Sequence, residues 1–321
     1  MSEPTFRPPL LPQRVVALGG GHGLAASLSA LRRACAHVTA VVTVADDGGS
    51  SGRLRREMGV LPPGDLRMAL AALCGDDDWG RTWSRVVQHR FRSGGDLHDH
   101  AVGNLLIVAL WELLGDSVAA LDLVGRLLEA QGRVLPMSLT PLDIEAEVET
   151  AAGTRTVRGQ VAVATCPDPV RSISLVPAEP DACPEAVEAI LEADWVVLGP
   201  GSWFTSVIPH LLVPDLAKAL HETAARRVVA LNLAAQPGET DGFSPENHLE
   251  VLREHAPGLR LDVVLADSAT VSDRAAFERM AGTFGARTVL ARVARDDGTP
   301  RHDAARLATA YREIIGAAAT P

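Results

Sequence analysis

The chain is poor in aromatic residues, in basic charge and in long apolar runs. Aromatic residues make up 4% of its 321 residues, with a single tyrosine, and the formal net charge is −10. A general nucleic-acid-binding protein needs basic stripes and stacking side chains, so these figures exclude that class. No apolar run reaches the roughly 18 residues that a membrane span needs. We therefore expect a globular protein with no nucleic-acid partner and no membrane span.

The cysteines and the first residues point to the same class of protein. Cys35, Cys74, Cys166 and Cys183 lie far apart and form no C-x-x-C motif. This spacing suits reduced thiols better than disulfides or a zinc site. The opening residues are proline-rich and lack the basic-then-apolar pattern of a signal peptide. We therefore expect a disordered lead-in over residues 1–13 and a cytoplasmic protein.

Short β-branched runs alternate with helical patterns along most of the chain. The runs at 14–19 and 37–44 flank an alanine- and leucine-rich helix at 23–35, which indicates a βαβ unit. Residues 65–131 carry apolar residues at helical spacing. This order predicts an α/β fold with a mainly parallel, doubly wound sheet and a helical insertion.

The remaining elements complete a single α/β domain over residues 14–317. A β-hairpin is expected from residues 143–150 and 155–165. Further strands are expected at 172–177, 194–201, 226–234, 261–267 and 287–294, and further helices near 184–193 and 303–316. Ligands of such sheets bind beyond the carboxyl ends of the strands, so the loops there are the candidate site.

The first strand leads into the sequence GGGHGLAASLSAL. From Gly21 it matches G-x-G-x-x-A, with a strand before it and a helix after it. Glycines let the backbone approach a pyrophosphate, whose charge then meets the free N–H groups of the new helix. Gly19, Gly20, Gly21, His22 and Gly23 are therefore predicted to bind phosphate. The alternative is a tight turn that binds no ligand.

The next loop, ADDGGSSGRL, gathers acids, hydroxyls and a guanidinium after the second strand. Its polar residues are Asp46, Asp47, Ser50, Ser51 and Arg53. Such a set suits ribose or sugar hydroxyls, with Mg²⁺ at Asp46 and Asp47 as an option. The alternative is an ordinary turn rich in aspartate and glycine.

The same loop contains G-G-S-S-G, which matches the G-x-S-x-G of a hydrolase nucleophile elbow. Ser50 would be the nucleophile. However, an elbow serine stands at the strand-to-helix turn itself, and residues 46–49 separate Ser50 from the strand. A serine hydrolase is therefore only a third alternative.

Two more loops place polar residues at the same expected edge of the sheet. Asp65, in PPGDLRMAL, is either a helix N-cap or a third acidic candidate. The sequence LGPGSWFTSVIPHL, at 198–211, offers a second anion-binding loop after a strand. Two such loops on one edge are what a diphosphate-linked ligand needs.

The stretch GDLHDHAVGN alternates acids and histidines. These residues are Asp96, His98, Asp99 and His100, with His89 nearby. They are compatible with a metal site, but polar side chains also cap helices at such positions. Asn104 lies inside an apolar run, where a buried amide needs partners. We therefore expect Asn104 to reach the ligand.

Six of these stretches together resemble one known family. GGGHGLAASLSAL, VTVADDGGSSGRLR, LPPGDLRMAL, HAVGNLLIVAL, LGPGSWFTSVIP and LNLAAQPGETDGF are similar, in matching order, to the YvcK-type gluconeogenesis factors. The resemblance runs from about Arg14 to about Asp267 and looks like the actinobacterial branch. The sister family is the 2-phospho-L-lactate transferase (CofD) family of coenzyme F420 synthesis.

The resemblance implies a Rossmann-like fold, a cytoplasmic location and a role in cell shape and envelope growth on gluconeogenic carbon. It implies binding of UDP-sugars such as UDP-N-acetylglucosamine, with cell-envelope regulatory proteins as partners and a homodimer as an option. By analogy with the sister family, phosphates would meet Gly19 to Gly23 and Gly201 to Ser206. The full expected set adds Asp46, Asp47, Ser50, Ser51, Arg53, Asp65, Arg67, His100, Asn104, Gly199, Gly201, Ser202, Thr205, Ser206, Asn232 and Gln236.

Three positions depart from the family pattern. His22 replaces a common threonine, Met68 stands where asparagine is usual, and Asp99 stands where glycine is usual. The first two count against transferase chemistry, and no general base is obvious. We therefore favour a nucleotide-sugar-binding regulator without turnover. A Mg²⁺-dependent phosphotransferase using Asp46, Asp47 or Asp65 is the second interpretation.

Overall fold

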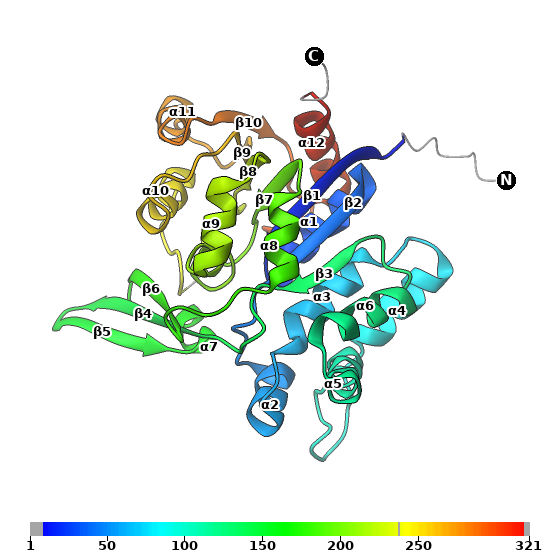
Figure 1. Cartoon of the computed structure of the whole chain (residues 1–321). Helices are drawn as coiled ribbons and strands as arrows, with labels where there is room; N and C mark the ends of the chain where they lie inside the picture. Colours follow the sequence, from blue (N-terminus) through cyan, green and yellow to red (C-terminus); the bar gives the residue numbers. More distant parts are fainter. Residues whose placement is uncertain (1–8, 237, 318–321) are drawn as a thin grey trace.

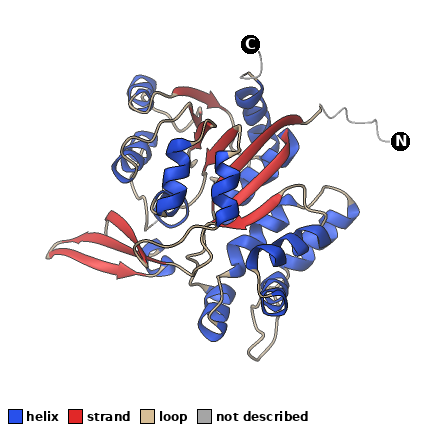
Figure 2. Ribbon diagram, in the orientation of Figure 1, coloured by secondary structure: helices blue, strands red, loops and turns tan. Residues whose placement is uncertain are grey.

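The apolar runs of the sequence become the strands of one large sheet. The computed structural model describes residues 9–236 and 238–317. Seven parallel strands lie in the order β10-β9-β8-β7-β1-β2-β3, with helices on both faces (Figure 1). A three-stranded antiparallel sheet lies beside them (Figure 2). The expected Rossmann-like α/β fold is confirmed.

The strands of the large sheet are short and mostly buried. They are β1 (Leu11–Gly19), β2 (Cys35–Val42), β3 (Arg133–Pro136), β7 (Trp195–Leu198), β8 (Arg226–Ala230), β9 (Val263–Asp267) and β10 (Arg287–Ala291). Strands β7 and β9 are buried along their whole length. Continuous burial is expected for parallel strands that helices cover on both faces.

Helices cover the two faces of this sheet. They include α1 (Gly21–Ala34), α8 (Pro184–Leu191), α9 (Pro214–Glu222), α10 (Pro245–His255), α11 (Arg274–Gly282) and α12 (Ala304–Gly316). Helices α1 and α12 pack together, and the buried hydroxyls of Ser27 and Tyr311 lie 2.8 Å apart between them. Helices α8 and α9 cover the opposite face (Figure 1).

Strand β1 is the point where the strand order reverses. The chain passes from β1 to β2 on one side, and later places β7 on the other side. In open α/β sheets, ligands bind beyond the carboxyl ends of the strands at such a switch point. The loops that follow β1 and β7 therefore flank the crevice where a ligand is expected.

The small sheet corrects the predicted hairpin. Its strands are β4 (Asp143–Thr150), β5 (Gly153–Arg158) and β6 (Val170–Val176), in the order β5-β4-β6. The second hairpin strand, expected over 155–165, ends at Arg158, because Gly159 turns the chain with a φ of 101°. Residues after it form α7 (Gln160–Ala164).

The predicted helical insertion consists of four helices joined by loops. They are α3 (Pro63–Leu73), α4 (Asp78–Gln88), α5 (Val102–Leu114) and α6 (Ser117–Leu127). A further helix, α2 (Gly49–Met58), starts inside the loop of acids and serines. Among the helices of the described residues, none has both the length and the apolar character of a membrane span.

The expected lead-in over residues 1–13 is wrong at its end, because β1 begins at Leu11. Leu11 pairs with Cys35 of β2 and packs against the core. Residues 1–8 lie outside the described part of the chain. All four cysteines fall within the described residues, where they are free and buried, so they are core thiols.

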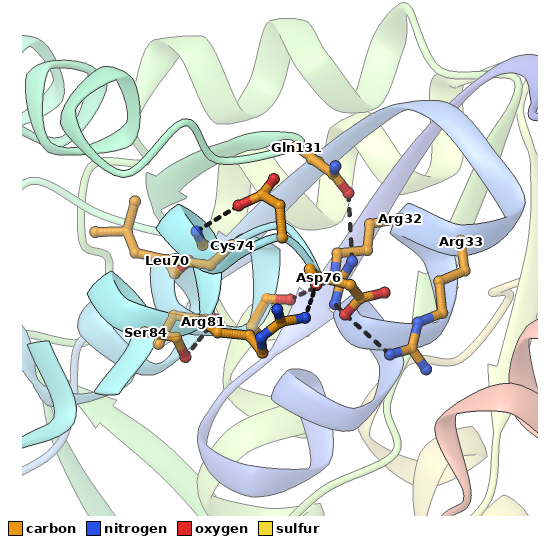
Figure 3. A network of polar contacts seen from close by, with 12 residues as sticks. Arg32, Arg33, Leu70, Cys74, Asp76, Arg81, Ser84 and Gln131 are labelled. Carbon is orange, nitrogen blue, oxygen red and sulfur yellow. Dashed lines mark hydrogen bonds and ion pairs between the residues drawn. The ribbon is translucent and has the colours of Figure 1, made fainter. Parts of the chain in front are cut away.

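A polar network fixes the end of α1 that lies away from its glycines (Figure 3). The guanidinium groups of Arg32 and Arg33 lie 2.6 and 3.2 Å from the Asp76 carboxylate, whose pKa their hydrogen bonds lower to about 2. Arg32 also donates to the carbonyl oxygen of Ala72 and to Gln131. The network ties α1 to the end of α3 and to the segment before β3, and so holds the helix that carries the glycine loop.

Candidate functional site

The glycine loop joins β1 to α1 and packs tightly against its neighbours. A Cβ at Gly20 would lie 2.4 Å from Cγ2 of Thr43 and 2.5 Å from Oδ2 of Asp65, so only glycine fits there. Gly21 has a φ of 57°, in the left-handed region, and its backbone N–H donates to Asp65. The loop thus turns its backbone toward the carboxyl edge of the sheet.

The two loops that flank the switch point are in backbone contact. A Cβ at Gly23 would lie 2.3 Å from the carbonyl oxygen of Pro200 and 2.4 Å from Cα of Gly201. The Ser206 hydroxyl oxygen would lie 3.2 Å from a Cβ at Gly20. The structure therefore brings together the two loops that the sequence predicted to bind phosphates.

Asp65 lies beside Gly20 of the glycine loop, and Asp46 lies beside Gly64, the residue before Asp65. Asp65 lies in the first turn of α3 but does not cap it, so the N-cap alternative is wrong. Its carboxylate accepts from Gly21 instead. Asp46 accepts from the backbone N–H of Gly48 at 2.9 Å, and its other oxygen would lie 2.8 Å from a Cβ at Gly64 in α3.

The half-buried Asp46 and the buried Asp65 lie close enough to each other and to the buried guanidinium of Arg67 for their charges to interact. Burial and the charge of Asp46 raise the pKa of Asp65 to about 7, and burial raises the pKa of Asp46. The positive charge of Arg67 opposes both shifts. Burial, with the charge of Arg90, lowers the pKa of Arg67 to about 10. The negative charge at this site is therefore incompletely compensated, and a cation would relieve it.

The side chain of Asp47 contacts the start of α7. Its Oδ1 accepts from the N–H of Val161 at 3.0 Å, and its Oδ2 would lie 2.3 Å from a Cβ at Gly159. Asp47 therefore anchors α7 and the small sheet to the loop after β2. The charge of Asp47 still raises the pKa of Asp46, but its carboxylate binds the backbone of α7, whereas the charge of Asp46 acts on Asp65.

The residues present fit Mg²⁺ only if a ligand completes the site. Among the described residues, no group of three or more His, Cys, Asp or Glu side chains could hold a metal ion. Mg²⁺ usually keeps several waters and binds one or two carboxylates together with substrate phosphates. Asp46 and Asp65 are two such carboxylates, next to the loop expected to hold phosphates.

Ser50 joins the start of α2 to the start of α5. Its Oγ lies 3.0 Å from Nδ1 of His100 and accepts from the side-chain amide of Asn104 at 3.0 Å. All three residues are buried. Ser50 lies within α2, eight residues beyond the end of β2, which is not the geometry of a nucleophile elbow. The carbonyl oxygen of the Asn104 side chain is buried and has no partner within residues 9–236 and 238–317.

Arginines hold the acid–histidine stretch in place, and within the described residues its side chains form no group of three or more His, Cys, Asp or Glu that could hold a metal ion. Arg53 donates to the carbonyl oxygens of Asp96 and His98. Arg90 contacts both the carbonyl and the carboxylate of Asp99. Asp99 has a φ of 61°, a conformation that glycine adopts freely and aspartate tolerates. A glycine at this position, as the family resemblance implies, would adopt the same conformation without strain.

The backbone donors of the second loop are already bound by the chain itself. The side chain of Asn232 accepts from the N–H of Gly201 at 2.9 Å and donates to its carbonyl oxygen at 2.8 Å. The carboxylate of Glu239 accepts from the N–H groups of Phe204 and Thr205 at 2.7 and 2.9 Å. Glu239 was not among the residues predicted from sequence, although it lies in the motif QPGETDG.

A family model described as "2-phospho-L-lactate transferase CofD" matches residues 15–299. The chain belongs to the CofD family. Among curated CofD-family relatives, it is 54% identical over 318 residues to a Mycobacterium tuberculosis protein named "Putative gluconeogenesis factor", covering 96% of this chain and 93% of the relative. It is 36% identical over 260 residues to the "Gluconeogenesis factor" of Bacillus subtilis, covering 81% and 80%.

The fold of this CofD-family chain also has a counterpart among solved structures. The crystal structure of a UPF0052 family member from Bacillus halodurans has a TM-score of 0.84 and 33% sequence identity. The match covers 94% of this chain and 99% of the other. The family model and the curated relatives confirm the resemblance of this chain to the YvcK-type, CofD-related family.

Many of the predicted residues of this CofD-family chain fall into three groups, and Ser202, Thr205, Asn232 and Gln236 belong to the second loop and its contacts. The glycine loop, Asp46, Asp65, Arg67, Gly201 and Ser206 lie together, whereas Ser50, His100 and Asn104 form an adjoining buried cluster. Asp47 and Arg53 contact α7 and the loop before α5. The prediction missed Glu239 and also Thr43, which lies against Gly20 and whose buried hydroxyl has no partner in the described part of the chain. Thr43 lies in the same motif as Asp46 and Asp47, but a single threonine within an apolar run carries no signal of a ligand site.

Proposed function

We propose that this CofD-family protein binds a diphosphate nucleotide of the UDP-N-acetylglucosamine type at the switch point between β1 and β7. The observation that carries the proposal is the backbone contact between Gly23 and Pro200–Gly201, near the buried Asp65 and the half-buried Asp46. The first turn of α1 offers N–H groups without intrahelical partners, together with the positive end of the helix dipole. A diphosphate supplies the matching acceptors and negative charge.

The carboxylates determine how such an anion is held. A diphosphate next to Asp46 and Asp65 would be repelled unless a cation or a proton intervened. Mg²⁺ held by Asp46, Asp65 and the phosphates would neutralise both sets of charges. We therefore propose that nucleotide binding depends on Mg²⁺.

The same proposal includes the biological role. We infer a regulator that acts in gluconeogenic carbon use, because relatives over most of the chain carry the name gluconeogenesis factor. The resemblance to the YvcK-type family adds a cytoplasmic location and a role in cell shape and envelope growth to this proposal. The ligand would report the supply of envelope precursors to cell-envelope regulatory proteins. A homodimer belongs to the same set of proposals.

A phosphotransferase is the second candidate, and one observation favours it. Asp65 has a pKa of about 7, which is the range in which a carboxylate works as a general base at neutral pH. No such base was evident from the sequence. In a transferase, Asp65 would take the proton of an acceptor hydroxyl as a phosphoryl group moves to it.

Thermal unfolding tests the ligand. A ligand that binds only the folded state stabilises it by about 2.7 kcal/mol at a hundredfold excess over Kd. At roughly 2–4 °C per kcal/mol, this should raise Tm by several degrees. With Mg²⁺, we expect UDP-N-acetylglucosamine to raise Tm more than UDP does, and NAD to give a smaller shift or none. With EDTA in place of Mg²⁺, the shifts should largely disappear.

The same samples separate a regulator from an enzyme. After hours with Mg²⁺, the UDP-sugar should remain intact by anion-exchange chromatography. Accumulation of UDP or sugar phosphate would favour the transferase. A larger shift with NAD would contradict the proposed ligand.

A further inference from the structure

The segment at residues 238–242, which follows β8, contacts the second loop of the site at residues 202–205. Gly238, with a φ of 81°, forms the turn that presents Glu239. A Cβ at Gly238 would lie 2.8 Å from the carbonyl oxygen of Ala164 in α7, so the turn is packed against that helix. The backbone N–H of Gly238 donates to the Asp241 carboxylate at 2.8 Å. The position of Glu239 is therefore fixed from outside the loop that it binds.

Three donors of the second loop converge on the Glu239 carboxylate. One oxygen accepts from the N–H groups of Phe204 and Thr205, and the other accepts from the hydroxyl of Ser202. The residue is 6% exposed. Burial raises the pKa of Glu239, while these hydrogen bonds lower it. A buried carboxylate with three such donors is a complete anion site in which the anion is part of the chain.

The position of this carboxylate matters for the neighbouring loop. Residues 202–205 lie directly between Gly201, which contacts Gly23, and Ser206, which lies beside Gly20. If the carboxylate were absent, two buried N–H groups would lose their acceptor, which costs more than the net value of a hydrogen bond. The loop would then have to rearrange or recruit another anion.

We propose that Glu239 is the built-in anion of the second loop and a positioning residue of the ligand site. By holding residues 202–205, it keeps Gly201 and Ser206 against the glycine loop. The diphosphate is therefore bound by the glycine loop, and the second loop contributes shape and the Ser206 hydroxyl. The part concerning the ligand rests on the proposed function, whereas the part concerning the loop does not.

Removal and replacement of the carboxylate test the loop directly. Amide hydrogen exchange should show residues 199–207 protected in the wild type and rapidly exchanging in Glu239→Ala. Formate should restore the protection, because it can fill the vacated anion site, whereas chloride should not. Glu239→Gln should stay protected without formate, since its carbonyl oxygen can still accept from Phe204 and Thr205. Glu254→Ala, at an exposed residue of α10, is the matched control.

Unchanged protection in Glu239→Ala, or a loss that formate does not reverse, would overturn the proposal. Nucleotide binding is measured on the same proteins. Glu239→Ala should weaken UDP-N-acetylglucosamine binding about tenfold or more, and formate should reverse most of this loss. Wild-type affinity in Glu239→Ala would refute the positioning role while leaving the proposed function intact. No binding by the wild type would refute the proposed function, and the exchange data would still decide whether Glu239 holds the loop.

Discussion

Gly21→Val should abolish nucleotide binding, weakening it by about a hundredfold or more, in a protein that still folds. Among the described residues, the space beside Gly21 is open, because the nearest atom to a Cβ at this position would be Oδ1 of Asp65, at 4.0 Å. A valine side chain there would stand where the phosphates are expected, not inside the core. The backbone strain of a side chain at a φ of 57° costs about 1–2 kcal/mol of stability.

Gly115→Val is the matched control for this substitution. Gly115 ends α5 with a φ of 67°, and a Cβ there would meet no atom of the described residues within 4 Å. Gly115→Val should therefore lose a similar free energy of unfolding, measured with urea. It should keep the nucleotide affinity of the wild type, measured by isothermal titration calorimetry. Equal affinity in Gly21→Val and the wild type would contradict phosphate binding by the glycine loop.

Asp65→Asn should stabilise the free protein while destroying Mg²⁺-dependent binding. The pKa of Asp65 is raised from 3.8 to about 7 in the folded state, so the folded protein binds the proton more tightly than the unfolded chain. Stability is therefore lost as pH rises from about 4 to about 7, and it stays lost above that. A shift of this size corresponds to about 4 kcal/mol. Asparagine removes the charge and should recover most of it.

Urea unfolding at several pH values measures whether Asp65→Asn raises or lowers the free energy of unfolding. The gain in Asp65→Asn should be largest at pH 8 and should vanish near pH 4. Asp76→Asn is the control of opposite sign, because ion pairing lowers the pKa of Asp76 to about 2. That variant should be less stable than the wild type at neutral pH. A destabilised Asp65→Asn at pH 8 would show that the buried charge is compensated in the free protein.

The fold could be predicted where a local pattern determines the element. The β-branched run before the glycines gives β1, and the alanine-rich run after them gives α1. Strand β3 was missed, because four residues, Arg133–Pro136, are strand-like only by pairing with β2. The helix α7 was taken for a strand because its valines and alanines suit either structure, and the turn at Gly159 decides between them.

The location of the candidate site could be predicted from local sequence patterns, but the contacts of its individual side chains could not. Glycines and acids at strand ends mark the site because the carboxyl ends of parallel strands meet at one edge. The direction of each carboxylate could not be predicted, since Asp46 and Asp47 are neighbours in sequence but contact different elements. Glu239 was missed because its partners, Phe204 and Thr205, lie 35 and 34 residues away. No local pattern reports such a contact.

A crystal structure with UDP-N-acetylglucosamine and Mg²⁺ tests the central claim most directly. We predict the diphosphate at the first turn of α1, with the metal between Asp46, Asp65 and the phosphates, and Glu239 still bound to the second loop. A nucleotide bound away from the switch point between β1 and β7 would contradict the account. A diphosphate on the N–H groups of Phe204 and Thr205, with Glu239 displaced, would contradict it equally.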